Sequence, residues 1–152
     1  NCAAVHLIEA DNSSYLCSNR KDSTYIYMKN IAETYWKRKK MPIPHLLLSD
    51  YEGRNVWSHK GIVHWRGMNI CMVTDGYWRN KSATNLLDID YMYLCKGYKG
   101  EIAPLQKLFH IKRIVLDASL GDYKSKAYKE ECKTLGLDYI DISEKGSFRI
   151  LL

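Results

Sequence analysis

The stretch YMYLC at residues 91–95 is a short apolar run rich in aromatic side chains, which predicts a buried β-strand. Residues 101–110 follow it with the pattern of a short helix, and Pro104 suits the first turn of that helix. The run RIVLD at residues 113–117 predicts a second strand. A strand, a helix and a strand in this order are typical of a sheet covered by helices.

The same pattern repeats toward residue 152. A second helix is expected after residues 121–122, with Tyr128 and Cys132 among its apolar positions and Gly136 at the left-handed position beyond its end. We then expect a strand at residues 139–142, a turn at residues 144–146 and a strand at residues 147–151. The C-terminal half of the chain therefore alternates strands and helices.

The N-terminal half predicts a hairpin, a helix and a β-meander. Residues 3–9 and 15–17 have strand-like patterns, with turn residues at 11–13. A helix is expected from about Thr24 to Lys39, capped by residues 22–23. The remaining strands are expected at residues 45–49, 55–57, 62–65 and 68–74, with a turn at residues 50–53. The whole pattern predicts one layered α/β domain of the α+β kind over residues 1–152, with mixed β-sheets covered by helices.

The apolar stretches are much shorter than the roughly 20 residues that a membrane-spanning helix requires. The chain starts without Met and without the pattern of a signal peptide, so we expect a soluble fragment of a longer protein. The five cysteines form no CxxC pair and are interpreted as buried thiols. In an oxidising compartment, Cys2 and Cys17 are the pair that adjacent strands would allow to form a disulfide.

No motif for a metal, a cofactor or a nucleophile is present. The five histidines are dispersed, and His59 and His64 are weak ligand candidates that we interpret as ordinary strand or turn residues. Residues 97–100 have too few glycines for a phosphate-binding loop. Neither Cys95 nor Ser119 lies in a nucleophile elbow. We therefore expect a binding or accessory domain that needs no cofactor, rather than an enzyme.

The net charge of +6 is compatible with a nucleic-acid or anionic partner, although many proteins with such a charge bind neither. Aromatic residues are numerous, and some lie close to cations in the sequence. Such side chains can stack on bases near Arg79 and Lys81, and they can equally be ordinary packing residues. The aromatic candidates are Trp57, Trp65, Tyr77 and Trp78.

The run at residues 87–95, the run IVLDAS at 114–119, the motif LGL at 135–137 and the run SEKGSF at 143–148 occur in a familiar order. Over about residues 68–151 the sequence resembles the C-terminal domain of the ComEC family of DNA-internalisation (competence) proteins, especially the Bacteroidetes type. That resemblance implies a fold related to the metallo-β-lactamases. It also implies that the parent protein is an inner-membrane channel that passes single-stranded DNA during natural transformation.

The metal-binding motifs of that fold are absent here. Where the resemblance implies a metal loop after the first long strand, this chain has DYEGR at residues 50–54, and the later ligand positions fall at VTDG, residues 73–76, and CKG, residues 95–97. The loops of this degenerate site are marked by Asp50, Asp75, Cys95 and Ser119. One carboxylate of the ligand type, Asp75, is too little to hold a catalytic zinc.

The resemblance therefore implies a non-catalytic accessory domain of a DNA-uptake channel, associated with the inner membrane through its parent protein. Its partners would be single-stranded DNA, the channel part of the same polypeptide and other competence proteins. The candidate nucleic-acid contacts are Arg79, Lys81, Lys96, Tyr98 and Lys99.

Two alternatives stay open. The first is a metal-dependent nuclease or hydrolase with an unrecognised ligand set, which would draw on Asp50, His59, His64 and Asp75. The second is a protein-docking module that binds its partner through an exposed aromatic patch.

Overall fold

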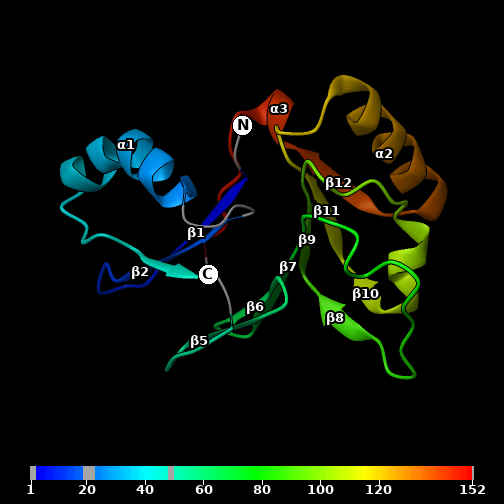
Figure 1. The fold of residues 1–152 in the computed structure, drawn as a ribbon, viewed down its shortest axis with the longest axis horizontal. Coiled ribbons are helices and arrows are strands. Elements are labelled where there is room, and N and C mark those ends of the chain that lie inside the picture. Colours follow the sequence, from blue (N-terminus) through cyan, green and yellow to red (C-terminus); the bar gives the residue numbers. More distant parts are fainter. Residues whose placement is uncertain (1–2, 19–22, 48–49, 152) are drawn as a thin grey trace.

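The computed structural model describes residues 3–18, 23–47 and 50–151, which form an α+β arrangement of sheets and helices (Figure 1). In chain order the elements are β1 (Ala4–Ile8), β2 (Ser14–Ser18), α1 (Ser23–Arg38), β3 (His45–Leu47), β4 (Tyr51–Glu52), β5 (Val56–His59), β6 (Ile62–Trp65), β7 (Met68–Val73), β8 (Leu87–Ile89), β9 (Tyr91–Leu94), the 3₁₀-helix η1 (Ala103–Lys107), β10 (Phe109–Ile111), β11 (Arg113–Leu116), α2 (Asp122–Leu135), β12 (Asp138–Asp141) and α3 (Ile142–Lys145).

The largest sheet has seven strands in the order β12-β11-β9-β7-β6-β5-β4. Neighbours from β12 to β7 are parallel, whereas β7, β6, β5 and β4 are antiparallel neighbours. Tight turns make the antiparallel half possible, because Lys60 and Gly61 join β5 to β6, and Arg66 and Gly67 join β6 to β7, all with positive φ. Turns with positive φ at both central residues match the right-handed twist of a hairpin.

Each face of the seven-stranded sheet packs against its own core. One face packs on α2, η1 and the small β8–β10 sheet, with Met92, Leu105 and Ile114 almost fully buried between them. The other face packs on the three-stranded β1-β2-β3 sheet, where Leu7, Cys17 and Leu47 meet residues of β5 to β7. The two sheets thus lie face to face, as expected for apolar faces that must both leave water.

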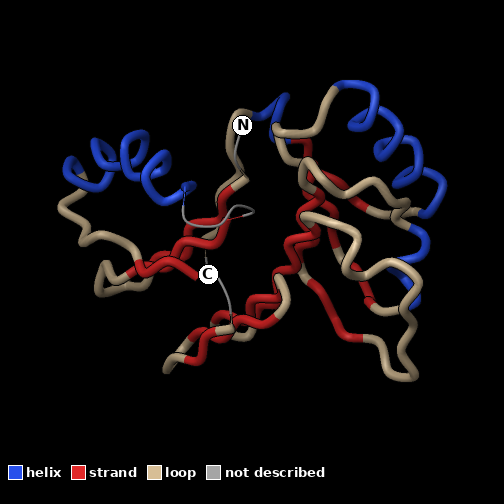
Figure 2. The backbone as a smooth tube through the Cα atoms, in the orientation of Figure 1, coloured by secondary structure: helices blue, strands red, loops and turns tan. Residues whose placement is uncertain are grey.

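Helix α1 covers the outer face of the three-stranded sheet, opposite the seven-stranded one (Figures 1 and 2). The Trp36 ring is 3% exposed and lies edge-on to His6 of β1, with ring centroids 6.1 Å apart. Burial lowers the pKa of His6. The order of layers is helix, sheet, sheet, helix, which confirms the expected α+β class with helices over mixed sheets.

Most of the expected elements are confirmed. The N-terminal hairpin pairs Ala4–Ile8 with Ser14–Ser18, and the expected helix at residues 24–39 is α1. The meander and both C-terminal βα units are present, and Gly136 ends α2 with a φ of 66°. The expected cap residue Asp22, the strand end at residues 48–49 and Cys2 lie outside the described residues.

Four local expectations were wrong, each for a physical reason. Residues 101–110 contain η1 and strand β10 rather than one helix, because Phe109–Ile111 pairs in parallel with β8. Residues 50–53 include the short strand β4, which pairs with β5. The turn expected at residues 144–146 is instead the end of helix α3 and the glycine that follows it. Asp141 caps this helix by accepting a hydrogen bond from the Ser143 N–H at 2.8 Å.

The expected strand at residues 147–151 is absent, because this apolar segment is held by side-chain packing instead of by strand pairing. Phe148 lies 5.7 Å from Tyr91, measured between ring centroids, and Ile150 packs on the core between the two sheets. The sequence pattern records that these side chains are apolar but not how their backbone is paired.

The cysteines within the described residues are all buried, namely Cys17, Cys71, Cys95 and Cys132. Burial raises the pKa of Cys17 and of Cys71 to about 12, so neither is a thiolate at neutral pH. The expected pairing of Cys2 with Cys17 involves a residue that the structure does not describe.

A buried ion pair ties β12 to α2. Asp141 is 4% exposed, its Oδ2 lies 2.6 Å from Lys129 Nζ, and it accepts a hydrogen bond from Ser125 Oγ at 3.0 Å. Burial alone would raise the pKa of Asp141, but the hydrogen bonds from Lys129, Ser143 and Ser125 outweigh burial and lower that pKa to about 2. The charged carboxylate is therefore the form that stabilises the fold.

We predict that Asp141→Asn lowers the free energy of unfolding at pH 7 by about 1–3 kcal/mol, because Lys129 loses a buried charged partner. Since the folded pKa is depressed, the wild-type advantage should be complete above about pH 4 and should shrink as the pH falls toward 2. Urea denaturation from pH 7 to pH 2.5 measures both effects. Glu144→Gln is the control, because Glu144 also pairs with Lys129 but is exposed, so its loss should cost less than about 1 kcal/mol. An equal cost for both variants would contradict the role of Asp141.

Candidate functional site

The carboxyl ends of β7, β9 and β11 lie at one edge of the seven-stranded sheet, and the loops that follow them are joined there. The Cys95 N–H donates to the Val73 carbonyl and the Asp117 N–H donates to the Leu94 carbonyl, both at 3.1 Å. The Lys96 N–H donates to Ser119 Oγ, also at 3.1 Å. Ligand sites of open α/β sheets are usually built from loops at this edge.

Asp117 and Ser119 fix the loop after β11. Both are buried, with 8% and 7% of their surface exposed, and the Ser119 N–H donates to Asp117 Oδ1 at 2.8 Å. Burial, and then the charge of Asp117, raise the pKa of Tyr93 to about 12. The hydroxyl of Ser119 thus serves as a hydrogen-bond acceptor for the neighbouring loop.

Gly97 allows the loops after β7 and β9 to approach each other closely. Its φ is +114°, and a Cβ at this position would lie 2.3 Å from the Thr74 carbonyl oxygen. No side chain fits there without moving backbone. The position of Lys96 at this edge therefore depends on a glycine one residue later.

Three of the residues that mark the expected degenerate site, Asp75, Cys95 and Ser119, follow β7, β9 and β11, whereas Asp50 lies elsewhere. Asp75 is exposed at the end of β7, where its Oδ1 accepts a hydrogen bond from the Tyr77 N–H at 2.8 Å. Cys95 is fully buried, and Ser119 holds Lys96. Asp50 precedes β4 at the far edge of the same sheet and pairs with His59 at 2.8 Å.

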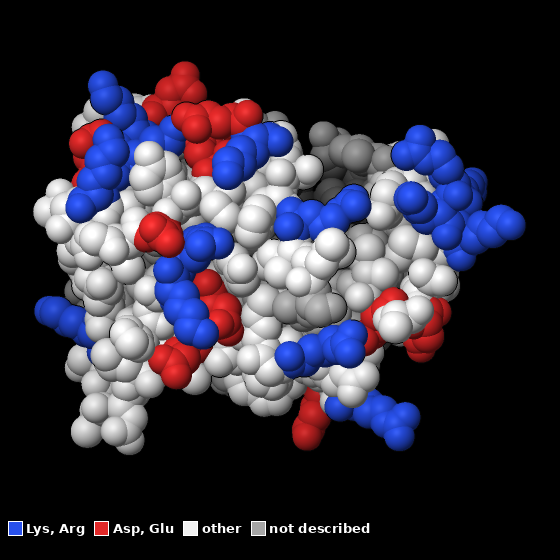
Figure 3. Space-filling model, turned by 180° about the vertical axis from the view of Figure 1, so that it is seen from behind, with Lys and Arg blue, Asp and Glu red and all other residues white. Residues whose placement is uncertain are grey.

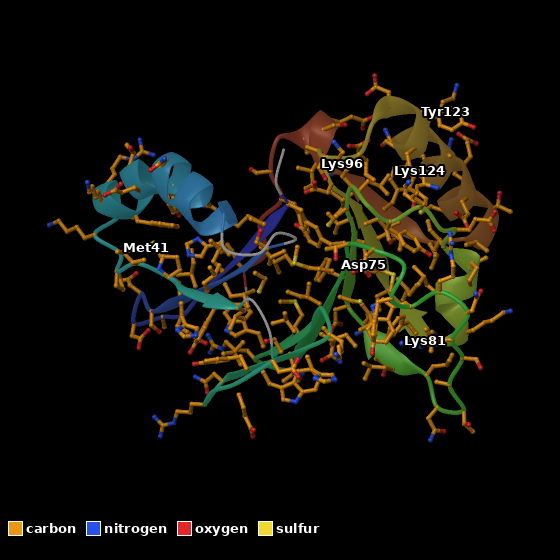
Figure 4. The ribbon with its side chains drawn as sticks, viewed as in Figure 1. Met41, Asp75, Lys81, Lys96, Tyr123 and Lys124 are labelled. Carbon is orange, nitrogen blue, oxygen red and sulfur yellow. The ribbon has the colours of Figure 1, made fainter. Side chains whose placement is uncertain are left out.

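The alternative metal-ligand set is also divided. His59 pairs with Asp50, whereas His64 Nδ1 lies 2.7 Å from Asn69 Oδ1. Asp75 belongs to another loop (Figure 4). Across residues 3–18, 23–47 and 50–151, no three His, Cys, Asp or Glu side chains are grouped so that they could hold a metal ion.

Cations and aromatic rings meet in the loop after β7. Lys81 Nζ lies 3.4 Å from the centroid of the Tyr77 ring and 5.7 Å from that of Trp78. Lys60 Nζ, from the turn between β5 and β6, lies 5.6 Å from the Tyr77 centroid. We call these four residues, Lys60, Tyr77, Trp78 and Lys81, the Tyr77 cluster.

The Tyr77 cluster is anchored on one side and open on the other. Trp78 packs edge-on against Phe109 of β10 at 5.1 Å between centroids, and Tyr77 packs edge-on against Trp78 at 4.7 Å. Tyr77 itself is 42% exposed. The sequence indicated Tyr77, Trp78 and Lys81 as a group of neighbouring rings and cations. It did not indicate Lys60, which is distant in the sequence and is brought to Tyr77 by the fold.

The other predicted nucleic-acid contacts fall into two regions. Arg79 is exposed two residues after Tyr77, whereas Lys96 and Lys99 are exposed in the loop after β9. Figure 4 shows Lys96 near the start of α2 and Lys81 at the opposite end of the same half of the molecule. The five residues therefore do not form one compact site.

Tyr98 is a core residue, which corrects its expected role as a nucleic-acid contact. It is 4% exposed, its hydroxyl donates to the Glu101 carbonyl at 2.6 Å, and its ring stacks on Tyr128. Burial, more than any neighbouring charge, raises the pKa of Tyr98 to about 12. Trp65 is likewise buried, with its Nε1–H donating to Glu9 Oε1 at 2.7 Å. Neither ring is open to a base.

A further group of cations lies at the end of α1, as Figure 3 shows on the side that carries this helix. It consists of Lys37, Arg38, Lys39 and Lys40, all exposed. Lys37 pairs with Glu33 of the preceding turn at 2.8 Å. Cations are favoured at a helix C-terminus, so part of this group has a structural cause.

Comparison with known proteins decides the family. The family model for the ComEC C-terminal domain matches residues 1–152. The chain belongs to this family. Residues 68–151 carry the resemblance seen in the sequence, and the family match extends it to the whole chain. No curated protein and no solved structure matches the chain.

Membership of the ComEC C-terminal domain family associates the chain with DNA uptake in competence and with a family of membrane proteins. Among the helices that the structure describes, none has the length and apolar character needed to cross a membrane. In this ComEC domain the exposed side chains in the loops after β7 and β9 include Tyr77, Lys81 and Lys96, together with the carboxylate of Asp75.

We predict that Gly97→Ala destabilises the domain by about 1–3 kcal/mol more than Gly67→Ala. Both glycines have positive φ, so both substitutions strain the backbone by about 1–2 kcal/mol. At Gly67 nothing lies within 4 Å of the added Cβ, whereas at Gly97 the Thr74 carbonyl blocks it. Thermal unfolding of the two variants measures the difference, and equal losses would show that the loops are not in close contact.

Proposed function

We propose that this chain is a non-catalytic accessory domain of a ComEC-like DNA-uptake channel and that it contacts single-stranded DNA through the Tyr77 cluster. The observation that carries the proposal is an exposed tyrosine ring held between a packed tryptophan and two lysine ammonium groups. Proteins that bind single strands without sequence preference combine such rings with cations along the backbone path.

The energies favour a base over the lysine on the Tyr77 ring. An exposed cation–π contact is worth about 0.5–1 kcal/mol, whereas a base stacked on an aromatic side chain is worth about 1–3 kcal/mol. Lys81 is on a surface loop, so a base can take its place on the ring while its ammonium group pairs with a phosphate. The Tyr77 ring and the Lys81 ammonium group, which now contact each other, would then both contact the same strand.

The proposed ligand is a single strand because a stacking ring needs an unpaired base. In a duplex the faces of the bases are covered by their neighbours, and reaching them costs a few kcal/mol per base. Tyr77 projects from a loop rather than from a helix or ribbon that could enter a groove. The net charge of +6 and the exposed Arg79 and Lys96 add attraction for phosphates of any strand.

The proposal of a non-catalytic role is supported by the tasks that the strand-end residues perform within the fold. Asp75 closes its own turn, Ser119 accepts a hydrogen bond from the Lys96 N–H, and Cys95 is enclosed in the core. Lys96 follows a strand end where the resemblance implies a metal ligand, and its positive charge would repel a metal ion. In this proposal the channel portion of the same polypeptide and other competence proteins are the protein partners.

We predict that the domain binds a fluorescent oligothymidylate with an affinity that falls steeply as salt rises. Each phosphate contact contributes about −0.7 to the slope of log K against log salt for a single strand. Lys81→Ala should therefore make the slope less steep by about 0.7. Tyr77→Ala should weaken binding about fivefold or more at every salt concentration and leave the slope unchanged, since it removes stacking and no charge.

Two matched controls separate this cluster from non-specific contact. Tyr123→Ala removes an aromatic ring that is 89% exposed on the first turn of α2, away from Lys81 (Figure 4). Lys39→Ala removes an exposed cation near the end of α1. Both should bind like the wild type. If Lys39→Ala weakens binding as much as Lys81→Ala, or if the wild type fails to bind at low salt, the proposal is wrong.

We also predict that the purified domain does not hydrolyse single-stranded DNA when Mg²⁺, Mn²⁺ or Zn²⁺ is added. The measurement is gel analysis of a labelled oligonucleotide alongside a domain that carries Asp75→Asn and His59→Ala. Cleavage by the wild type that this double variant abolishes would establish the metal-dependent alternative and overturn the non-catalytic role.

A further inference from the structure

One part of the seven-stranded sheet is covered on only one of its faces. Along β5 the residues alternate, with Val56 and Ser58 buried while Trp57 and His59 are exposed. Trp57 pairs directly with His64 of β6, so the two side chains share the open face. This is the face that packs on α2 and η1 farther along the sheet, and those elements do not extend over the hairpin (Figure 1).

Trp57 and His64 line an open groove of about 590 Å³. Its wall is formed by the turn between β4 and β5 and by the turn between β6 and β7, with Arg54, Asn55 and Arg66 among the lining residues. The carboxylate in the lining is Glu52. Trp57 is 42% exposed, so a large part of its ring is open to a ligand.

The exposed face of β5 leads from the groove toward the Tyr77 cluster. His59 is two residues from Trp57 on the same face, and Lys60 follows in the turn. Three residues of strand span about 10 Å, and Lys60 Nζ then reaches within 5.6 Å of the Tyr77 centroid. The Trp57 ring and the Tyr77 ring are thus two exposed aromatic positions along one path, with cations at both ends.

We propose that the Trp57 groove is a second base-stacking position for the same single strand, so that the strand runs along the open face of the β5–β6 hairpin. This inference rests on the proposed function and deepens it by naming a path and its far end. A base would stack on Trp57, and Arg54 and Arg66 would contact the adjoining phosphates.

The polar surroundings of Trp57 favour a nucleic acid over a protein as the occupant. The lining holds the guanidinium groups of Arg54 and Arg66 and the carboxylate of Glu52, and Glu9 lies 3.6 Å from Arg66, so cations and carboxylates are balanced at this end of the path. Along the path, Asp50 is paired with His59. Trp57 is an isolated ring among polar neighbours, whereas a protein-docking face needs a contiguous apolar patch.

The test compares Trp57→Ala and Tyr77→Ala on oligothymidylates of two lengths. With a strand of about 16 nucleotides, which can reach both rings, each variant should weaken binding about fivefold or more. With a dinucleotide, which can occupy one ring at a time, the loss caused by Trp57→Ala should be twofold or less. Trp57→Phe keeps a stacking surface and should retain most of the affinity for the long strand.

Each other outcome has a defined meaning. If the wild type binds and Tyr77→Ala weakens binding while Trp57→Ala does not, the Trp57 position is wrong and the proposed function stands. If Trp57→Ala has the same effect at both lengths, the two rings do not share one strand, and the path is refuted. If the wild type binds neither strand, the proposed function itself fails. If Trp57→Ala shifts the elution volume of the domain while binding is unchanged, the hairpin face is a self-association surface and the inference falls.

Discussion

The pairing of β7 on both of its edges is the constraint on which the rest of the structure depends. On one edge β7 is parallel to β9, and on the other it is antiparallel to β6. Its side chains serve both cores, since Cys71 and Val73 face the α2 layer whereas Ile70 and Met72 face the three-stranded sheet. A strand buried on both faces has little freedom of register, because a slip of one residue would exchange the two sets.

This change of strand direction also determines where ligand chemistry can lie. Parallel strands need long crossover connections, and in this domain those connections place η1, α2 and the β8–β10 sheet over one half of the face. Antiparallel strands need only short turns, so the β5–β6 hairpin leaves its half of the same face open. The Tyr77 cluster lies where the two halves meet. Tyr77 is in the loop after β7, the strand that both halves share, and Lys60 is in the turn of the β5–β6 hairpin.

Sequence patterns predicted the elements that are long or strictly periodic, and failed where a contact between distant residues decides the structure. Helix α2 and its end at Gly136 followed from apolar spacing and a left-handed cap. Strands β8 and β10 are three residues each and exist because they pair with one another. The sequence neighbours of Tyr98 are cations, but its ring is in the core, where it stacks on Tyr128 of a distant helix. Lys60 likewise approaches Tyr77 only because β5, β6 and β7 are paired in one sheet.

Backbone groups and a buried side chain hold together the loops at the carboxyl ends of the parallel strands. Backbone hydrogen bonds join β7, β9 and β11 at their ends, Asp117 orders the last loop from a buried position, and Gly97 permits the closest approach. An exposed position such as Lys96, which contributes its backbone N–H to these contacts, can therefore carry another side chain while the loops keep their places. In this domain that separation leaves room for the cations and aromatic rings of the loop after β7 without any change in the strand ends that support them.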